Sequence, residues 1–121
     1  SYNINEMAEK LNALVNDTTA SNTYITFFYG ELNKQTGEFS YINAGHIPTI
    51  IMNKKDHITR LDTCGFCLGM FPTVDYEVRA SRLEIGDTAL LFTDGITESR
   101  NKANEEYTEE RLIKVLTISQ C

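Results

Sequence analysis

The sequence predicts an α+β domain in which antiparallel sheet fills the middle of the chain and a helix lies at each end. Three observations predict it: an amphipathic helical pattern early in the chain, short aromatic and β-branched runs between tight turns, and a second helical pattern late in the chain. Strands and helices do not alternate, so a doubly wound parallel sheet is excluded. With 121 residues, the chain accommodates one domain, residues 1–121.

The first helix and the first hairpin follow from periodicity and turn chemistry. Apolar residues recur at helical spacing at Ile4, Met7, Leu11 and Leu14. Residues 24–29 are aromatic and β-branched and predict a strand. Because both of its faces are apolar, we expect this strand to be central and covered on both sides. The polar turn at residues 33–37 then leads into residues 39–44, the second arm of a hairpin.

Four further strands are predicted in the second half of the sheet region. They occupy residues 48–52, 57–61, 74–80 and 88–92. Residues 74–80 alternate with period two, which is typical of a half-exposed strand. Residues 88–92 form a near-continuous apolar run, which predicts a buried strand.

A C-terminal helix is predicted to follow Thr108, a favourable N-cap residue. Glu109 and Glu110 suit the positive end of the helix dipole. We expect the apolar face, which includes Leu112 and Leu116, to pack onto a sheet face.

Composition excludes several classes of protein. Hydrophobic residues are 41% and the net charge is −6, so the chain is neither disordered nor suited to binding the phosphate backbone of nucleic acid. The apolar runs are too short for a membrane segment, and no signal-peptide core opens the chain. The three cysteines argue against a disulfide framework and favour a cytoplasmic protein. Because the first residue is Ser1 rather than Met, we expect a fragment of a longer chain.

The first candidate site is the segment of residues 92–98. A carboxylate at the end of a predicted strand, Asp94, is followed by Gly95, and this arrangement can hold a divalent cation. Glu98 adds a second carboxylate nearby. The alternative is that Asp94 and Gly95 form an ordinary strand-ending turn and that Glu98 is only a solvated charge.

The second and third candidates are a histidine loop and a cysteine pair. In the loop that contains Asn43, Gly45 and His46, the histidine could be a general acid, a metal ligand or a phosphate-binding group; the alternative is a loop histidine that bonds the backbone. Cys64 and Cys67 could form a redox pair or half of a zinc site. No helix can follow them, so we expect both thiols to be reduced and free of metal.

The motifs taken in order resemble the bacterial PPM-type serine/threonine phosphatases of the stage II sporulation protein E and RsbU group. They span residues 24 to 112 and include the segments 26–32, 36–48, 65–69, 83–87, 93–98 and 110–112. The resemblance implies an α-β-β-α sandwich of antiparallel sheets. It also implies hydrolysis of phosphoserine or phosphothreonine by a water activated by two Mn²⁺ or Mg²⁺ ions, with no catalytic side chain.

The resemblance also implies roles for residues and partners. Asp94 matches a metal ligand, and Gly95, Glu98, Asn43, Gly45 and His46 are expected near the site. The substrate would be a phosphorylated regulatory protein such as an anti-sigma-factor antagonist, in signal transduction that regulates sigma factors.

Two family features are missing from this sequence: an early Gly-Asp-x-x-Gly segment and a late acidic residue on a final strand. We therefore expect a partial domain that is inactive by itself and whose open sheet edges favour self-association. Two other interpretations remain: a non-catalytic binding or regulatory module with the same fold, and a redox or zinc protein built on Cys64 and Cys67.

Overall fold

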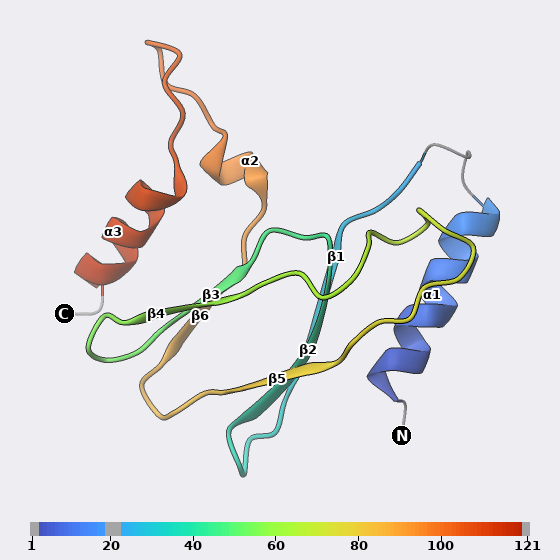
Figure 1. Cartoon of the computed structure of the whole chain (residues 1–121). Coiled ribbons are helices and arrows are strands. Elements are labelled where there is room, and N and C mark those ends of the chain that lie inside the picture. Colours follow the sequence, from blue (N-terminus) through green and yellow to red (C-terminus); the bar gives the residue numbers. More distant parts are fainter. Residues whose placement is uncertain (1–2, 19–22, 120–121) are drawn as a thin grey trace.

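The computed structural model describes residues 3–18 and 23–119, and Figure 1 shows two antiparallel sheets between terminal helices. One sheet has the strand order β1-β2-β5 and the other β4-β3-β6. The elements are α1 (Ile4–Thr18), β1 (Phe27–Leu32), β2 (Glu38–Ala44), β3 (Thr49–Met52), β4 (Ile58–Leu61), β5 (Arg79–Arg82), β6 (Thr88–Leu90), α2 (Asp94–Thr97) and α3 (Glu109–Ser119). All four strand pairings are antiparallel, which confirms the predicted α+β class.

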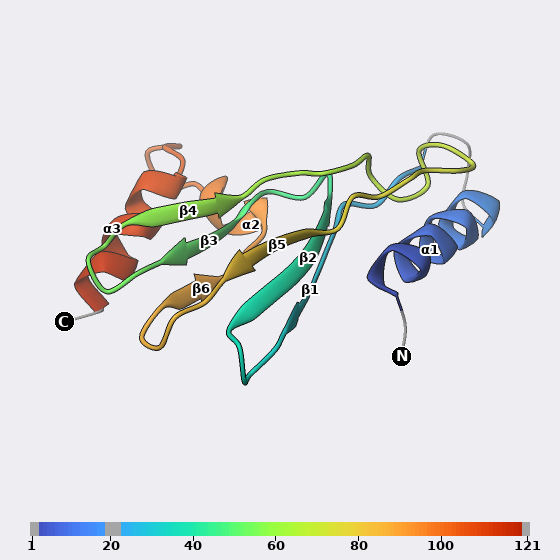
Figure 2. The same ribbon diagram turned by 60° about the horizontal axis from the view of Figure 1, so that its bottom comes forward.

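The helices lie at opposite ends of the molecule. Figures 1 and 2 place α1 beside the β1-β2-β5 sheet and α3 beside the β4-β3-β6 sheet. The order of the layers is therefore helix, sheet, sheet, helix, as the predicted sandwich requires. No described helix is long and apolar enough to cross a membrane.

The side chains of β2 alternate between two faces, so this strand contacts the other sheet on one face and α1 on the opposite face. Phe39 and Tyr41 form a buried cluster with Ile51 and Leu61 of the other sheet. Phe28 stacks on Tyr41 with ring centroids 5.7 Å apart and adds to this contact. Successive side chains of a strand point to opposite faces, so the intervening residues of β2 face the other way.

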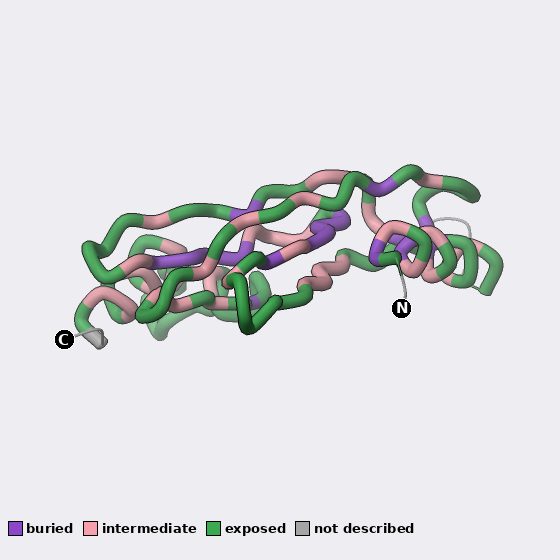
Figure 3. Tube along the Cα trace, turned by 90° about the horizontal axis from the view of Figure 1, so that it is seen from below, coloured by how far each residue is buried: buried purple, intermediate pink, exposed green. Residues whose placement is uncertain are grey.

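The opposite face of β2 forms the core under α1. Ile42 and Ala44 are fully buried in one cluster with Ile4 and Ala8 of the helix. Leu68 and Tyr76, from the long connection between β4 and β5, complete this cluster. Figure 3 shows buried residues concentrated along the strands and beside α1.

The prediction that residues 24–29 form a central strand was wrong. β1 begins at Phe27, continues to Leu32 and lies at the edge of its sheet, whereas β2 is central. β2 carries the more continuous burial, and Ile25 instead forms an isolated bridge with Leu68. The outer edge of β1 has no partner strand among the described residues, and self-association along such an edge stays a prediction.

Two other predicted strands were misplaced. Residues 74–80 overlap β5 only at Arg79 and Ala80, because Tyr76 is buried in the core under α1. Of the predicted strand at residues 88–92, only Thr88–Leu90 forms β6, and it is half-buried. Asp94 therefore does not end a buried strand.

The helix α3 begins at Glu109, directly after the predicted cap Thr108. Leu112 and Leu116 are half-buried, and no α3 residue is buried among those whose burial is described. An ion pair ties the start of α3 to β4, because Arg60 Nη2 lies 2.7 Å from Glu109 Oε1.

Candidate functional site

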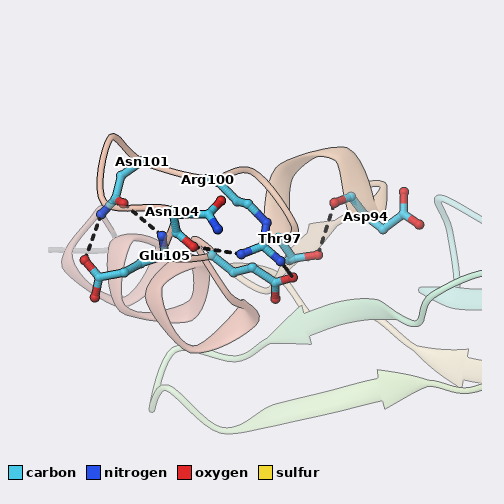
Figure 4. A network of polar contacts seen from close by, with 7 residues as sticks. Asp94, Thr97, Arg100, Asn101, Asn104 and Glu105 are labelled. Atoms are coloured by element: carbon cyan, nitrogen blue, oxygen red, sulfur yellow. Dashed lines mark hydrogen bonds and ion pairs between the residues drawn. The ribbon is translucent and has the colours of Figure 1, made fainter.

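Asp94 is the first residue of the short helix α2. Thr93 precedes it in an extended conformation, and the Glu98 N–H donates to the Asp94 carbonyl at 2.8 Å. Figure 4 shows the Asp94 carboxylate pointing away from the other labelled side chains. The carboxylate is exposed and makes no hydrogen bond or ion pair within the described part of the chain. It is therefore a hard oxygen donor that is free to bind a cation.

An arm of the chain, residues 99–108, follows α2 and is held together by many hydrogen bonds, and the sequence analysis did not predict it. The Arg100 guanidinium donates to the Asn104 carbonyl at 2.8 Å and to Glu106 Oε1 at 3.0 Å (Figure 4). Asn101 Oδ1 accepts the N–H groups of Ala103 and Glu105. The two asparagines that frame this turn were the available signal, since asparagine bonds its own backbone readily.

The base of the arm closes against α2. The Tyr107 N–H donates to the Ser99 carbonyl at 2.7 Å, and the Thr108 N–H donates to the Thr97 carbonyl at 2.9 Å. These bonds fix the end of the helix that begins at Asp94. Glu98, the second predicted carboxylate, is the exposed C-cap residue of this helix.

Asn43 organises the histidine loop from inside the protein. Its side chain is 0% exposed, its Nδ2 donates to the Leu61 carbonyl at 2.9 Å, and its Oδ1 accepts the His46 N–H at 2.8 Å. A buried amide with both ends bonded holds the chain in one conformation. Asn43 therefore shapes the loop rather than presenting its side chain to a ligand.

His46 bonds the backbone, and its role at the site stays a prediction. Its Nδ1 lies 2.8 Å from the Ile47 carbonyl, so Nδ1 carries the proton and donates. In the neutral ring, Nε2 is then left with a lone pair.

The histidine loop packs against the cysteine segment, so the structure brings together two candidates that were predicted separately. Gly45 has φ +69°, and a Cβ at this position would lie 2.4 Å from Cys67 Sγ. The Gly45 N–H donates to Thr63 Oγ1 at 3.0 Å, and the Asn43 N–H donates to Cys64 Sγ at 3.2 Å. Only glycine combines this backbone conformation with this close approach.

The cysteines and tyrosines in this region have defined surroundings. Cys64 and Cys67 are not joined by a disulfide and are half-buried, and their freedom from metal stays a prediction. Burial raises the pKa of Tyr76 to about 12, with a smaller contribution from the nearby Cys67. Burial also raises the pKa of Tyr41, although Arg79 opposes the shift.

The described residues contain no cluster of side chains that could hold a metal ion by itself. In residues 3–18 and 23–119, no three His, Cys, Asp or Glu side chains lie close enough together to hold a metal ion. The Asp94 carboxylate is a free, hard oxygen donor, and its role as a metal ligand stays a prediction. Mg²⁺ and Mn²⁺ require several such oxygens, so Asp94 by itself does not make a site for either ion.

Comparisons with known proteins agree on one family. The family model described as stage II sporulation protein E (SpoIIE) matches residues 1–120. Over 94 residues, which are 78% of this chain, it is 33% identical to protein IcfG of Synechocystis sp. (strain ATCC 27184 / PCC 6803 / Kazusa). Over 98 residues, 80% of this chain, it is 34% identical to the phosphoserine phosphatase RsbU of Bacillus subtilis (strain 168). The chain spans 15% and 29% of the lengths of these two relatives.

Two solved structures share the fold. A crystal structure of the RsbU and RsbW domains of Rv1364c from Mycobacterium tuberculosis matches 98% of this chain and 33% of its own, with a TM-score of 0.76 and 26% identity. The phosphatase domain of SpoIIE from Bacillus subtilis, in a structure presoaked with Mn, matches 95% of this chain and 49% of its own, with a TM-score of 0.57 and 19% identity.

Proposed function

The chain belongs to the stage II sporulation protein E (SpoIIE) family, and from this membership we propose that it is part of a metal-dependent serine/threonine protein phosphatase. The substrate class would be phosphoserine or phosphothreonine on a small regulatory protein, such as an anti-sigma-factor antagonist. A relative described as a phosphoserine phosphatase and a related structure that contains both RsbU and RsbW domains support this proposal. A cytoplasmic location stays a prediction.

The observation that carries the proposal is the free carboxylate of Asp94. A carboxylate in the first turn of a helix can bond to a helix N–H group or to a neighbouring cation. The Asp94 carboxylate does neither within the described residues, although α2 and the arm fix the backbone around it. An exposed, unpartnered oxygen donor on a fixed backbone suits a cation ligand.

In this proposal each part of the chain has a distinct role. Asp94 holds one of two Mn²⁺ or Mg²⁺ ions, which when bound would supply an activated water for attack on phosphorus. The bonds at Ser99–Tyr107 and Thr97–Thr108 keep α2 in place so that the carboxylate does not shift. Asn43 keeps the loop that contains His46 in one conformation.

The experiment compares three proteins in a p-nitrophenyl phosphate and phosphoserine-peptide assay with Mn²⁺. They are a parent chain that extends ahead of Ser1, the same chain with Asp94→Asn, and residues 1–121 alone. We expect the parent to turn over substrate and the Asp94→Asn parent to lose about 99% or more of that activity, because the substitution removes the charge that holds the cation. Residues 1–121 should show background activity only.

Each contrary outcome has a clear meaning. An Asp94→Asn parent with undiminished turnover would contradict the metal role of Asp94. A parent that binds its phosphoprotein but never hydrolyses it, with any divalent metal, would favour the non-catalytic binding or regulatory module. Strong turnover by residues 1–121 alone would show that the ligand set is complete within this chain.

A further inference from the structure

A loop whose backbone is anchored at both ends presents aromatic side chains to solvent at the end of the molecule that carries α1. This loop, residues 64–72, is anchored at its start because the Cys64 N–H donates to the Asn43 carbonyl at 2.8 Å. It is anchored at its end because Asn12 Oδ1 accepts the Gly69 N–H at 2.8 Å and Asn12 Nδ2 donates to the Phe71 carbonyl at 3.0 Å. These bonds at both ends restrain the backbone of the loop.

The side chains displayed by this loop are large and apolar. Phe66 is 59% exposed, Phe71 46% and Met70 45%. The rings of Phe66 and Phe71 meet edge to face, with centroids 5.1 Å apart. Exposed aromatic and methionine side chains are enriched at protein-binding surfaces.

A hollow beside these rings has the size and lining of a side-chain pocket. It has a volume of about 530 Å³ and is lined by Cys64, Gly65, Phe66, Phe71, Thr73, Val74 and Asp75. Its walls are mostly apolar, and the carboxylate of Asp75 is the charged group at its rim. We name this hollow the Phe66–Asp75 pocket.

The charges around the pocket define what it can accept. A second hollow shares Thr73, Val74 and Asp75 and adds Glu9 from α1. Neither hollow is lined by Lys or Arg among the described residues, and the chain carries a net charge of −6. An anionic membrane or a nucleic acid would be repelled, and a second copy of this acidic chain would bring like charges together.

We propose that the Phe66–Asp75 pocket is a docking site for a protein partner that inserts an apolar side chain and places a Lys or Arg beside it. The apolar group packs against Phe66 and Phe71, and the cation pairs with Asp75 and lies near the exposed ring of Phe66. The inference does not depend on the proposed phosphatase activity, since Asp94 is not part of the pocket.

The test uses the ¹⁵N-labelled 121-residue chain and capped probe peptides. The probe is Gly-Ser-Phe-Arg-Ser-Gly, and the matched peptides replace Arg by Glu or Phe by Ser. We expect the probe alone to shift the amide signals of Phe66, Phe71, Val74 and Asp75. It should also slow the alkylation of Cys64 by iodoacetamide relative to Cys67, which does not line the pocket.

Variants locate the interaction. Phe66→Ser should raise the dissociation constant for the probe about tenfold, because the substitution removes an aromatic anchor. Asp75→Asn should raise the dissociation constant about threefold, which is the typical effect of losing an exposed charge pair. Asp94→Asn, the matched carboxylate substitution elsewhere, should leave it unchanged, so failure here and failure of the phosphatase proposal are distinguishable.

Four results would overturn the docking proposal. They are equal binding of the Arg and Glu peptides, an unchanged dissociation constant in both Phe66→Ser and Phe71→Ser, signal shifts centred on another surface, and tighter binding to phosphatidylglycerol vesicles than to the probe. Thermal unfolding of each variant confirms that a loss of binding is not a loss of folding.

Discussion

At the scale of single residues, Asn43 uses both ends of its amide: Nδ2 donates to the Leu61 carbonyl and Oδ1 accepts the His46 N–H. Asn43→Ala leaves a buried acceptor and a half-buried donor without partners, so we expect the free energy of unfolding to fall by about 2–3 kcal/mol. Urea denaturation measures this change. The matched control is Asn33→Ala, which removes an exposed amide that accepts the N–H groups of Gln35 and Thr36 and should cost under about 1 kcal/mol. Equal losses in the two variants would contradict this account.

Tyr76 gives a pH dependence with a definite sign. Burial raises its pKa from 10.0 to about 12, so between these values the unfolded chain loses the phenol proton before the folded chain does. Stability contributed by this difference is fully present below pH 10 and is lost as the pH rises through about 12. Over that pH interval, we expect the free energy of unfolding of Tyr76→Phe to fall by about 2 kcal/mol less than that of the wild-type chain. Urea midpoints at several pH values compare the two chains, and parallel curves would show that Tyr76 is not the group responsible.

At the scale of elements, periodicity and turn chemistry correctly predicted the helix over α1 and the hairpin of β1 and β2. The signal for the hairpin was the polar turn at residues 33–37, where Gly37 adopts φ +79°. The alternation at residues 74–80 misled because Tyr76 is drawn into the core, and a Cβ on Gly65 would lie only 2.6 Å from its ring. Such a long-range contact overrides a local strand pattern.

In the candidate site too, local patterns were predicted from the sequence, whereas long-range contacts were not. Sequence patterns predicted Asp94 and the loop at Asn43, and the structure places both on well-bonded backbone. The sequence patterns did not reveal that the side chains of Thr63 and Cys64 accept hydrogen bonds from this loop, because the partners lie about twenty residues apart along the chain. Thr93 before Asp94 was a signal for a helix start, but the apolar run ahead of it favoured a continued strand.

The ion pair between Arg60 and Glu109 gives a prediction for α3. Arg60 Nε also donates to Glu109 Oε1, at 2.8 Å, and the two side chains are 46% and 37% exposed. Solvent screens an exposed pair, so a double-mutant cycle with Arg60→Gln and Glu109→Gln should give a coupling energy of about 0.5 kcal/mol. Hydrogen exchange of the α3 amides should also become faster in each variant.

The matched control for that cycle is Arg82 and Glu84, an exposed pair two residues apart that joins no separate elements. Breaking it should leave exchange in α3 unchanged. Faster α3 exchange in the Arg82 variant, or none in the Arg60 variant, would refute the anchoring role of Arg60.

At the scale of the whole molecule, the end that carries α1 buries more apolar side chains than the end that carries α3. The core under α1 and the cluster between the sheets contain most of the buried apolar residues, and Ile50, Met52 and Phe92 are the described ones outside both clusters. The helix α3 has no buried residue among the positions whose burial is described. The loop at Asn43 belongs to the firmly packed part. Asp94 belongs to an exposed part that hydrogen bonds, rather than burial, hold in place.

The central claim is that the free carboxylate of Asp94 is a ligand for the catalytic metal, and a manganese titration of the ¹⁵N-labelled chain tests it most directly. We expect paramagnetic broadening to appear first at the amide signals of Asp94 and Gly95. It should require high Mn²⁺ concentrations, because one carboxylate binds such an ion weakly. The same titration of Asp94→Asn should show no broadening there. Broadening centred on Glu105, Glu106 and Glu109, and unchanged by Asp94→Asn, would contradict the claim.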